Sequence, residues 1–568
     1  MFRLFPHKDR NAQIRGELID YDLSDAGGRS HLYEALSYVW YDSEGSTDMD
    51  SQSIILNDCI FSVTPNLYAA LLRLRNHQLE RALWIDAVCI NQSDDDEKQE
   101  QIPLMQTIYA QASRVIVWLG EARSNSDEAL ENIRRLAGDS VNDGPASDRY
   151  HNYTSATDGP STAKSVMIDH DACEMLFKRN WFRRIWVLQE VGVARYISII
   201  CGHVEMNGYT FWKGFSRLNL SSSILSHVHP VIHLMRDAIL RPKYQHDSRG
   251  TLFIGELIDR YRTHDATVQH DKVYALLGLS ADDPKTPALK PDYASPWNDV
   301  FVQLTTYLLG EKCLMQTWPD RDIAVIKGKG WILGYVNSSR SRTPEDGRES
   351  LTIEFIHTAG WMRDSSSLRN KWTLRTPAEL VQVGDIICLL QGATRPSIIR
   401  LCRDHFKIVM TTITPHNGER TLDLNPQESD CTSDSLYNIL LTWGIPRAGA
   451  KNDVGLQDPV ELRNIAPEYQ ECPYEAKTRF NDMVLIVNKI IQRTLSSGII
   501  FGTGALERIL VQCTGNLPFS EEVVKEAASS DMAGRKAVEL LIQHHGENLP
   551  ITDDVIKAAA KKGRPETL

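Results

Sequence analysis

LWIDAVCINQSDDDEKQEQIPLMQTIYAQASRVIVWLG, residues 83–120, contains two short apolar runs, Leu83–Ile85 and Val115–Leu119, separated by an acidic loop and an amphipathic segment. Apolar runs of this length are typical of buried strands, and the apolar residues between them follow helical spacing. The helical positions are Ile102, Met105, Ile108, Tyr109 and Ala112. The stretch therefore predicts a strand, a crossover helix and a second parallel strand, the unit from which doubly wound α/β sheets are built.

This stretch also contains polar residues that could form a binding site and a proline inside the predicted helix. Asp86 and the polar loop 91–97 follow the first strand directly, and ligands of such sheets bind beyond the carboxyl ends of the strands. Pro103 lies inside the helical pattern, where a proline costs about 3 kcal/mol. We therefore expect the regular helix to start or to kink at Pro103.

Further strand signals flank this unit on both sides. Tyr33–Trp40 has the pattern of a buried first strand, 53–63 that of a hairpin turning at Asn57-Asp58, and Tyr196–Cys201 that of a later strand. The expected fold is therefore α/β with helices on both faces of a mainly parallel sheet, whose strands lie near 34–39, 83–86, 115–119 and 196–201.

The composition limits the class of protein. A chain of 568 residues with 42% hydrophobic and 24% charged residues predicts two to four globular domains. No apolar run approaches the roughly 20 residues that cross a bilayer, and the first twenty residues lack the apolar core of a secretory signal. A net charge of −12 argues against a nucleic-acid surface.

The cysteines and the clustered histidines predict neither a disulfide framework nor a metal site. Among ten cysteines, the two nearest in sequence are Cys388 and Cys402, a spacing that fits no zinc ribbon or dense set of disulfides. We therefore expect reduced thiols and a cytoplasmic protein. Four possible metal ligands lie close together in the sequence: His264, Asp265, His270 and Asp271. Their spacing fits no common ligand pattern, so we expect these side chains to cap helices or to face water, with no bound metal.

The candidate catalytic residue is Glu190, in the segment NWFRRIWVLQEVGVARYISIICG that starts at Asn180. Asn180 is a good helix N-cap, and the helix that it would start carries Phe182, Trp186, Glu190 and Val193 along one face. A carboxylate among apolar neighbours needs a hydrogen-bond partner or has its pKa raised, as in an acid prepared for chemistry. The alternative is an ion pair that only orients the helix, with Arg183, Arg184 or Arg195.

Four blocks of the sequence together resemble the motifs of the fungal heterokaryon incompatibility (HET) domain. They are ALSYVW at 35–40, LWIDAVCINQ at 83–92, the apolar series from Met105 to Gly120, and WFRRIWVLQE at 181–190. The chain departs from the usual pattern at Tyr41, where a glycine commonly follows the tryptophan, and at Pro103. The resemblance implies nonself recognition and programmed cell death after fusion of incompatible cells, an incompatibility partner protein and self-association through the HET domain.

The HET domain has been proposed to be remotely similar to TIR domains, which implies a TIR/flavodoxin-like sheet. Enzymatic TIR domains cleave the nicotinamide–ribose bond of NAD through a glutamate that often lies four residues after a tryptophan, and Trp186 precedes Glu190 by that spacing. The resemblance implies Glu190 as the catalytic residue of an NAD glycohydrolase, with NAD as substrate and no cofactor. The implied substrate-binding residues are Ser37, Tyr38, Trp40, Asp86, Asn91 and Trp186. The alternative is a non-enzymatic TIR-like scaffold that signals death by recruiting partners.

The rest of the chain divides by composition. We expect a HET domain over 1–220, with its motif blocks in 31–192, a helical region over 221–320, a small β module over 321–425 and a helical region over 426–568. Within the first of these, 139–164 is poor in large apolar residues and is expected to be a surface insertion. The β module is predicted to contain three consecutive strands, VQVGDIICLLQG, PSIIRLCRD and HFKIVMTTI.

The last region contains a sequence repeat. RILVQCTGNLPFSEEVVKEAA at 508–528 recurs as LLIQHHGENLPITDDVIKAAA at 540–560. In each copy Ser520 or Thr552 follows a proline by two residues and precedes acidic residues, which is typical of a helix start. Such units bury their apolar faces against neighbours, so the pattern predicts helical repeats that form an interaction surface.

Overall fold

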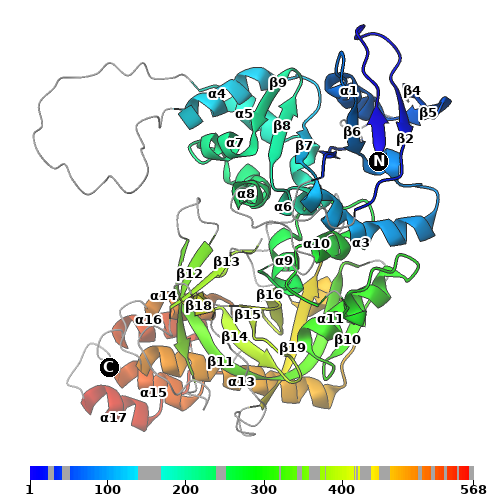
Figure 1. Ribbon diagram of the computed structural model, residues 1–568. Coiled ribbons are helices and arrows are strands. Elements are labelled where there is room, and N and C mark those ends of the chain that lie inside the picture. The colour runs from blue at the N-terminus through cyan, green and yellow to red at the C-terminus, as the bar shows by residue number, and fades with distance from the viewer. Residues whose placement is uncertain are drawn as a thin grey trace, which may run out of the picture. The chain divides into compact units, whose positions relative to one another are not determined.

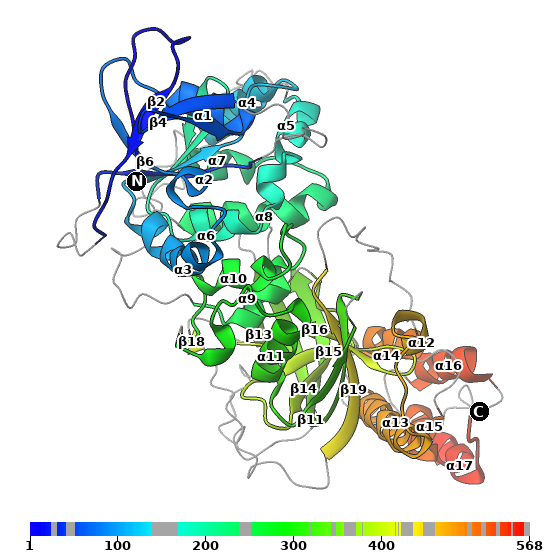
Figure 2. The same ribbon diagram turned by 90° about the vertical axis from the view of Figure 1, so that its right-hand side faces the viewer.

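The computed structural model of the protein describes residues 1–23, 31–40, 52–138, 168–237, 251–283, 285–318, 321–341, 348–356, 371–375, 377, 379–414, 416–417, 420–421, 436–446, 461–496, 502–512, 518–529, 534–546 and 549–561 (Figures 1 and 2). The chain divides into two units. The first contains Met1–Gly250, His264–Ala266 and Tyr274–Leu279, and the second contains Thr251–Thr263, Thr267–Val273 and Ser280–Leu568. The predicted insertion 139–164 lies outside the described residues.

The first unit is built on a mixed nine-stranded sheet in the order β5-β4-β2-β1-β6-β3-β7-β8-β9. Its strands are β1 (Phe2–Leu4), β2 (Arg15–Leu18), β3 (Glu34–Ser37), β4 (Gln52–Leu56), β5 (Cys59–Val63), β6 (Arg81–Trp84), β7 (Arg114–Trp118), β8 (Ile197–Cys201) and β9 (Val204–Asn207). The helices packed with it are α1 (Pro65–Leu74), α2 (Asp86–Cys89), α3 (Asp95–Gln111), α4 (Ser126–Gly138), α5 (His170–Phe177), α6 (Trp186–Gly192), α7 (Gly208–Phe215) and α8 (Ser222–Asp237).

The four strands predicted from the sequence lie side by side in this sheet, and β6, β3, β7 and β8 are mutually parallel. The expectation that the sheet as a whole is mainly parallel is wrong. β1 runs antiparallel to β6 at one side of the parallel core, and β9 runs antiparallel to β8 at the other. The short turns of the β4–β5 and β8–β9 hairpins impose antiparallel pairing, because a parallel connection needs a longer crossover.

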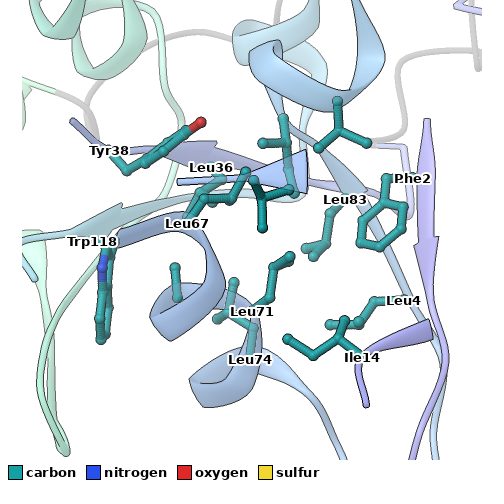
Figure 3. Packing of buried hydrophobic residues seen from close by; sticks show 14 of the residues in the cluster. Phe2, Leu4, Ile14, Leu36, Tyr38, Leu67, Leu71, Leu74, Leu83 and Trp118 are labelled. Carbon is teal, nitrogen blue, oxygen red and sulfur yellow. The ribbon is translucent and has the colours of Figure 1, made fainter. Parts of the chain in front are cut away.

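Helices cover both faces of the parallel core. On one face, α1 packs Leu67, Leu71 and Leu74 against Leu36 and Leu83 of the strands, and Figure 3 shows this cluster with Tyr38 at its edge. On the other face, the ring of Tyr109 in α3 meets Trp84 of β6 edge-on at 5.3 Å. The strands are therefore buried from both sides, which explains why they appear in the sequence as continuous apolar runs.

The amino ends of the three central strands are joined by one carboxylate. Glu34 at the start of β3 accepts from Nε of Arg81 on β6 at 2.7 Å and from Nε of Arg114 on β7 at 2.6 Å. Glu205 of β9 extends this network with a contact of 3.1 Å to Arg114. These ion pairs join β6, β3, β7 and β9 at the amino edge of the parallel core.

Several local predictions are confirmed and two are wrong. Asn57 and Asp58 have positive φ values of 50° and 60°, as a tight hairpin turn requires. The helix containing Pro103 does not start there, because α3 begins at Asp95, where the Asp94 side chain accepts from two backbone amides. The alternative, a kink at Pro103, stays a prediction.

The second error concerns the segment of Glu190. The predicted continuous helix from Asn180 is instead a 3-10 turn, η3 (Asn180–Arg183), followed by α6 from Trp186. Phe182 therefore lies on a different element from Glu190, and the predicted shared line of side chains begins only at Trp186.

The second unit contains a ten-stranded sheet whose core closes on itself. Its strands are β10 (Leu314–Thr317), β11 (Ile323–Ser341), β12 (Arg348–Phe355), β13 (Lys371–Arg375), β14 (Ile386–Leu390), β15 (Ser397–Leu401), β16 (Phe406–Met410), β17 (His416–Asn417), β18 (Arg420–Thr421) and β19 (Leu436–Gly444). Because β11 pairs with both β19 and β14, the strands β14-β15-β16-β19-β11 form a closed ring. The three consecutive strands predicted in this region are β14, β15 and β16.

The helices of the second unit start with α9 (Ile254–Tyr261) and α11 (Trp297–Leu309), while α10 (Asp271–Leu277) is divided between the segments of the two units. Asp259 of α9, which is fully buried, accepts from the Thr411 amide at 2.6 Å and from its hydroxyl at 2.8 Å. This carboxylate fixes α9 to the end of β16.

Helices follow the last strand. They are α12 (Leu462–Ile465), α13 (Pro473–Ser496), α14 (Gly502–Gln512), α15 (Glu521–Ser529), α16 (Gly534–His545) and α17 (Asp553–Lys561), and Figure 2 shows α13 beside β19. No helix in the described part of the chain combines the length and apolar character needed to span a membrane.

Candidate functional site

A cluster of buried polar groups lies at the carboxyl end of β3. Ser37 is the last residue of this strand and is fully buried. Its hydroxyl accepts a hydrogen bond of 2.9 Å from the indole nitrogen of Trp181, which lies in η3 and is 1% exposed. The 3-10 turn thus places a tryptophan against the strand end, and Ser37 is held between the sheet and the segment that carries Glu190.

Glu190 lies on α6 and is only 3% exposed. Burial raises the pKa of this carboxyl group to about 7, while the charge of Arg184 and a hydrogen bond from the Ser37 side chain pull the pKa down and Asp86 pushes it up. In the described part of the chain, no group hydrogen-bonds its Oε2 atom. Glu190 is therefore a buried acid that is poised to change its charge near neutral pH.

Asp86 is the second carboxylate at this edge. It follows β6 directly and starts α2. Its Oδ2 accepts from the indole nitrogen of Trp40 at 3.0 Å, and its Oδ1 accepts from the Ala87 amide at 2.7 Å. The Gln92 side chain donates to the Asp86 carbonyl at 2.9 Å. Asp86 is held in place by these three hydrogen bonds and remains partly exposed.

Arg184 supplies the positive charge of the cluster. Its guanidinium donates to the carbonyl oxygen of Tyr38. Burial alone would lower the pKa of Arg184, yet the nearby Glu190 and Asp86 raise it. Burial and the same carboxylates hold the pKa of the Tyr38 hydroxyl well above its usual range, so this hydroxyl stays protonated and is a hydrogen-bond donor. One guanidinium thus faces two carboxyl groups, one of which titrates near pH 7.

Most of the predicted site residues meet in this cluster. Ser37, Tyr38 and Asp86 act electrostatically on Glu190 or on each other, and Trp40 joins through its hydrogen bond to Asp86. Asn91 does not join: it is exposed, and its side chain accepts from Ser93 within the same loop.

Trp186 starts α6 one turn before Glu190 and is half-buried; among the described contacts, none links it to the cluster by a hydrogen bond or charge.

Two members of the cluster were missed or left open by sequence reasoning. Trp181 carried no signal of its role, because its partner Ser37 is 144 positions away in the chain. Arg184 was one of three arginines considered as a partner of Glu190, and its charge is the one that lowers the pKa of Glu190. Arg183 instead pairs with Asp265 at 3.1 Å. Within the described ranges, no group of three or more His, Cys, Asp or Glu side chains is arranged to hold a metal ion.

The part of the chain that forms this cluster also matches a known protein family. Residues 33–190 match the family described as heterokaryon incompatibility protein (HET). The chain carries a HET domain. The match begins at the strand that ends in Ser37 and stops at Glu190, so it spans the elements that form the cluster.

A curated relative supports this assignment. Heterokaryon incompatibility protein 6, OR allele, of Neurospora crassa is 26% identical over 328 residues, which are 50% of this chain and 48% of that protein. The chain thus spans about half the length of the relative that it matches. Outside the HET domain, residues 540–564 match a domain of unknown function, DUF7104. No solved structure matches the chain significantly.

The hydrogen bond between Trp181 and Ser37 gives a first test of the cluster. Trp181→Phe should lower the free energy of unfolding by about 1–3 kcal/mol, because it removes a buried donor and part of a buried ring. Urea unfolding measures the change, and Trp186→Phe, at a half-buried position on the next element, is the control with a smaller expected loss. Equal losses in both variants would show that the hydrogen bond to Ser37 contributes nothing specific.

Proposed function

We propose that the protein acts in heterokaryon incompatibility and that its HET domain is the effector that triggers cell death. The HET match and the name of the Neurospora relative support this role. We further propose that the effector acts by hydrolysing the nicotinamide–ribose bond of NAD or of a related nucleotide. The observation that carries this second step is a buried glutamate, Glu190, with a pKa near 7 at the carboxyl end of β3.

The winding of the sheet supports a ligand at this place. Numbered by position in the chain, the parallel strands β3, β6, β7 and β8 lie in the order 2-1-3-4. Flavodoxin-like sheets begin with the same order, and their ligands bind at the point where the strand order reverses, outside the carboxyl ends of the strands. Ser37 ends the first strand at that point, and Glu190 lies beside it.

Cleavage of the nicotinamide–ribose bond requires Glu190 in its ionised form, as a carboxylate, and does not require it as a proton donor. When the bond between C1′ of the ribose and the nicotinamide nitrogen breaks, its electron pair stays on the nitrogen and neutralises the pyridinium, so the leaving group needs no proton. The ribose is left with positive charge, which an ionised Glu190 stabilises. Water then adds to C1′ and releases one proton, and the products are nicotinamide and ADP-ribose.

The burial of Glu190 sets a condition on this reaction. A carboxylate that is 3% exposed meets substrate only after the segment from Trp181 to Glu190 moves, and such gating is common in enzymes that exclude water during chemistry. The same burial and the charge of Arg184 favour a second candidate, a scaffold in which Glu190 orients α6 and death follows from partner recruitment.

Nicotinamide release by the purified full chain separates the two candidates. The enzyme predicts that the wild type converts NAD into equal amounts of nicotinamide and ADP-ribose, measured by liquid chromatography, and that Glu190→Ala does not. Glu128→Ala, at an exposed position on α4, is the control and should keep the wild-type rate. A wild type that kills cells without consuming NAD would reject the enzyme and leave the scaffold.

The charge of Arg184 makes the pH dependence a sharper test. Because the ionised form of Glu190 is the active one and its pKa is about 7, NAD cleavage should rise with pH and reach half of its maximum near pH 7. Arg184→Gln removes the cation that lowers this pKa, so the midpoint should move upward by about one pH unit. Arg183→Gln, which breaks only the exposed pair with Asp265, should leave the midpoint unchanged, and a shift in this control would refute the assignment.

We also infer that the carboxyl-terminal helices are two structural repeats. The sequence copies fall on matching helices, since α14 and α16 carry their first halves and α15 and α17 their second halves. The packing of α14 with α16 and of α15 with α17 supports a stack of two equivalent helix pairs. The match of 540–564 to a family model supports treating the second copy as a recurring unit.

A further inference from the structure

The last helix pair exposes apolar residues at positions where the preceding pair buries them. In the alignment of the two copies, Phe519 corresponds to Ile551 and Val524 to Ile556. Phe519 is 7% exposed and Val524 4%, whereas Ile551 is 59% exposed and Ile556 45%. Since the positions match, the difference arises from what covers each pair.

The outer helices provide an internal comparison. Val511 on α14 and its counterpart Ile542 on α16 are 43% and 49% exposed. These two positions face solvent to the same extent in both copies. Exposure of Ile551 and Ile556 is therefore a property of one face of the terminal pair and does not reflect a general loosening of its packing.

The contacts between the pairs show what covers this face in the first copy. The ring of His545 in α16 meets Phe519 edge-on, with 4.2 Å between ring centres. The hydroxyl of Thr552, just before α17, donates to Oε1 of Glu521 at 2.6 Å. The second helix pair thus covers the forward face of the first with an aromatic contact and one hydroxyl–carboxylate hydrogen bond.

We propose that the forward face of the terminal pair, formed by Ile551, Asp553 and Ile556, binds a helix pair of the same type as α16–α17 that belongs to a partner protein. This face continues the interface between the two pairs of the chain. Asp553 stands at the position of Glu521 and is exposed, so it accepts from the serine or threonine that starts the second helix of the incoming pair.

The polarity of the stack identifies a partner as the occupant and argues against a second copy of this chain. Stacking in the same direction requires a free backward face on the incoming pair. In this chain α13 packs against α14 and α15, and Asn488 of α13 accepts from the Ser520 amide at 2.9 Å and donates to the Pro518 carbonyl at 3.2 Å. The backward face of the first pair is therefore occupied, and that of the second pair is covered by the first.

A synthetic peptide of residues 534–561 is the probe, because it carries the backward face of the unit. The fluorescently labelled peptide should bind the full chain saturably in an anisotropy titration. The double variant Ile551→Asp/Ile556→Asp should weaken binding at least tenfold, and the control Val511→Asp, at an outer position of similar exposure, should not. Circular dichroism and thermal melting should be unchanged in both variants, because all three side chains are exposed.

A covalent version guards against a peptide that fails to fold. The same 28-residue segment, fused after Leu568 through a flexible linker, should slow amide hydrogen exchange in α17 of the full chain, and the double variant should remove this protection. Absence of both binding and protection would overturn the proposal. A dimer of the unmodified chain in light scattering that the double variant abolishes would also overturn it, since a second copy would then be the occupant.

Discussion

Glu190→Gln should abolish NAD cleavage, lowering the rate at least a hundredfold, and at the same time make the HET-domain unit more stable at pH 8. The loss of activity follows from the loss of the charge that faces the ribose cation, because glutamine has nearly the same size but stays neutral. Removing one well-placed electrostatic contribution of this kind commonly costs about 10²–10³ in rate. Cell killing should fall together with NAD cleavage.

The gain in stability follows from proton linkage. Burial raises the pKa of Glu190 from 4.5 to about 7, so the folded state binds the proton more tightly than the unfolded state. The stability that this group contributes is complete below pH 4.5 and is lost as the pH rises through 7. One pKa unit corresponds to about 1.4 kcal/mol, so the loss is roughly 3 kcal/mol by pH 8. Glutamine does not ionise, and the variant escapes this loss.

Urea unfolding at pH 5 and pH 8, followed by amide exchange within residues 168–201, measures the effect. The difference between variant and wild type should be larger at pH 8 than at pH 5. Glu128→Gln is the matched control, since Glu128 is exposed on α4 and should change neither NAD cleavage nor the pH dependence. A variant whose stability follows the wild-type pH dependence would show that Glu190 does not titrate in the folded state.

Opposite effects on activity and stability distinguish the enzyme from the scaffold. A residue retained only to orient α6 should stabilise the fold, so its replacement should cost stability at every pH. A residue retained for chemistry is often destabilising where it stands, because active sites hold charges in surroundings that disfavour them. Glu190, Asp86 and the guanidinium of Arg184 form such an arrangement.

The parallel core of the first unit was predictable because each of its strands is a short apolar run bounded by turn residues. β3, β6, β7 and β8 are buried on both faces, which leaves a continuous signal in the sequence. The β4–β5 hairpin was also predictable from its turn, but the antiparallel strands β1, β2 and β9 carry no such signal. β2 reads RGEL with one buried residue, and it is a strand only because it pairs with β1 and β4.

Two stretches of the sequence carry competing signals for where a helix starts or continues, and in both the structure follows the signal that the prediction did not. Asp94 accepts from the amides of Asp96 and Glu97, and this cap starts α3 well before Pro103 despite the cost of the proline. Between Arg183 and Trp186 the helical spacing suggested one helix, but Arg184 has an extended backbone with ψ 133°. That break turns the Arg184 guanidinium toward Tyr38, an interaction that no spacing rule contains.

The sequence predicted those features of the site that depend on one helix or one strand alone. Helical spacing predicted that Glu190 would lie among apolar neighbours, and its side chain is buried. The spacing left open whether the carboxyl group would pair with an arginine or have its pKa raised. The position of Ser37 and Asp86 at strand ends was predictable from the winding rule. The partners of these residues were not, because the contacts between Trp181 and Ser37 and between Trp40 and Asp86 join distant parts of the chain.

Leu541→Asp should unfold the carboxyl-terminal helices while the HET domain stays folded. Leu541 is fully buried in α16, and a charge placed there without a partner costs roughly 4–5 kcal/mol or more, which exceeds what a stack of two short helix pairs is expected to supply. Repeat units interact mainly with their neighbours, so the damage should spread through α14–α17 along the stack.

The neighbouring residue supplies the control for this change. Ile542 follows Leu541 on the same helix but is 49% exposed, so Ile542→Asp should alter the free energy of unfolding by no more than about 0.5 kcal/mol. Hydrogen exchange with mass spectrometry reads both regions in one experiment. Leu541→Asp should expose the amides of α14–α17 and leave those of β3, β6 and β7 protected. Loss of protection in the strands as well would mean that the helices and the HET domain fold as one cooperative unit, and the helices would then stabilise the effector directly instead of serving it as a separate docking element.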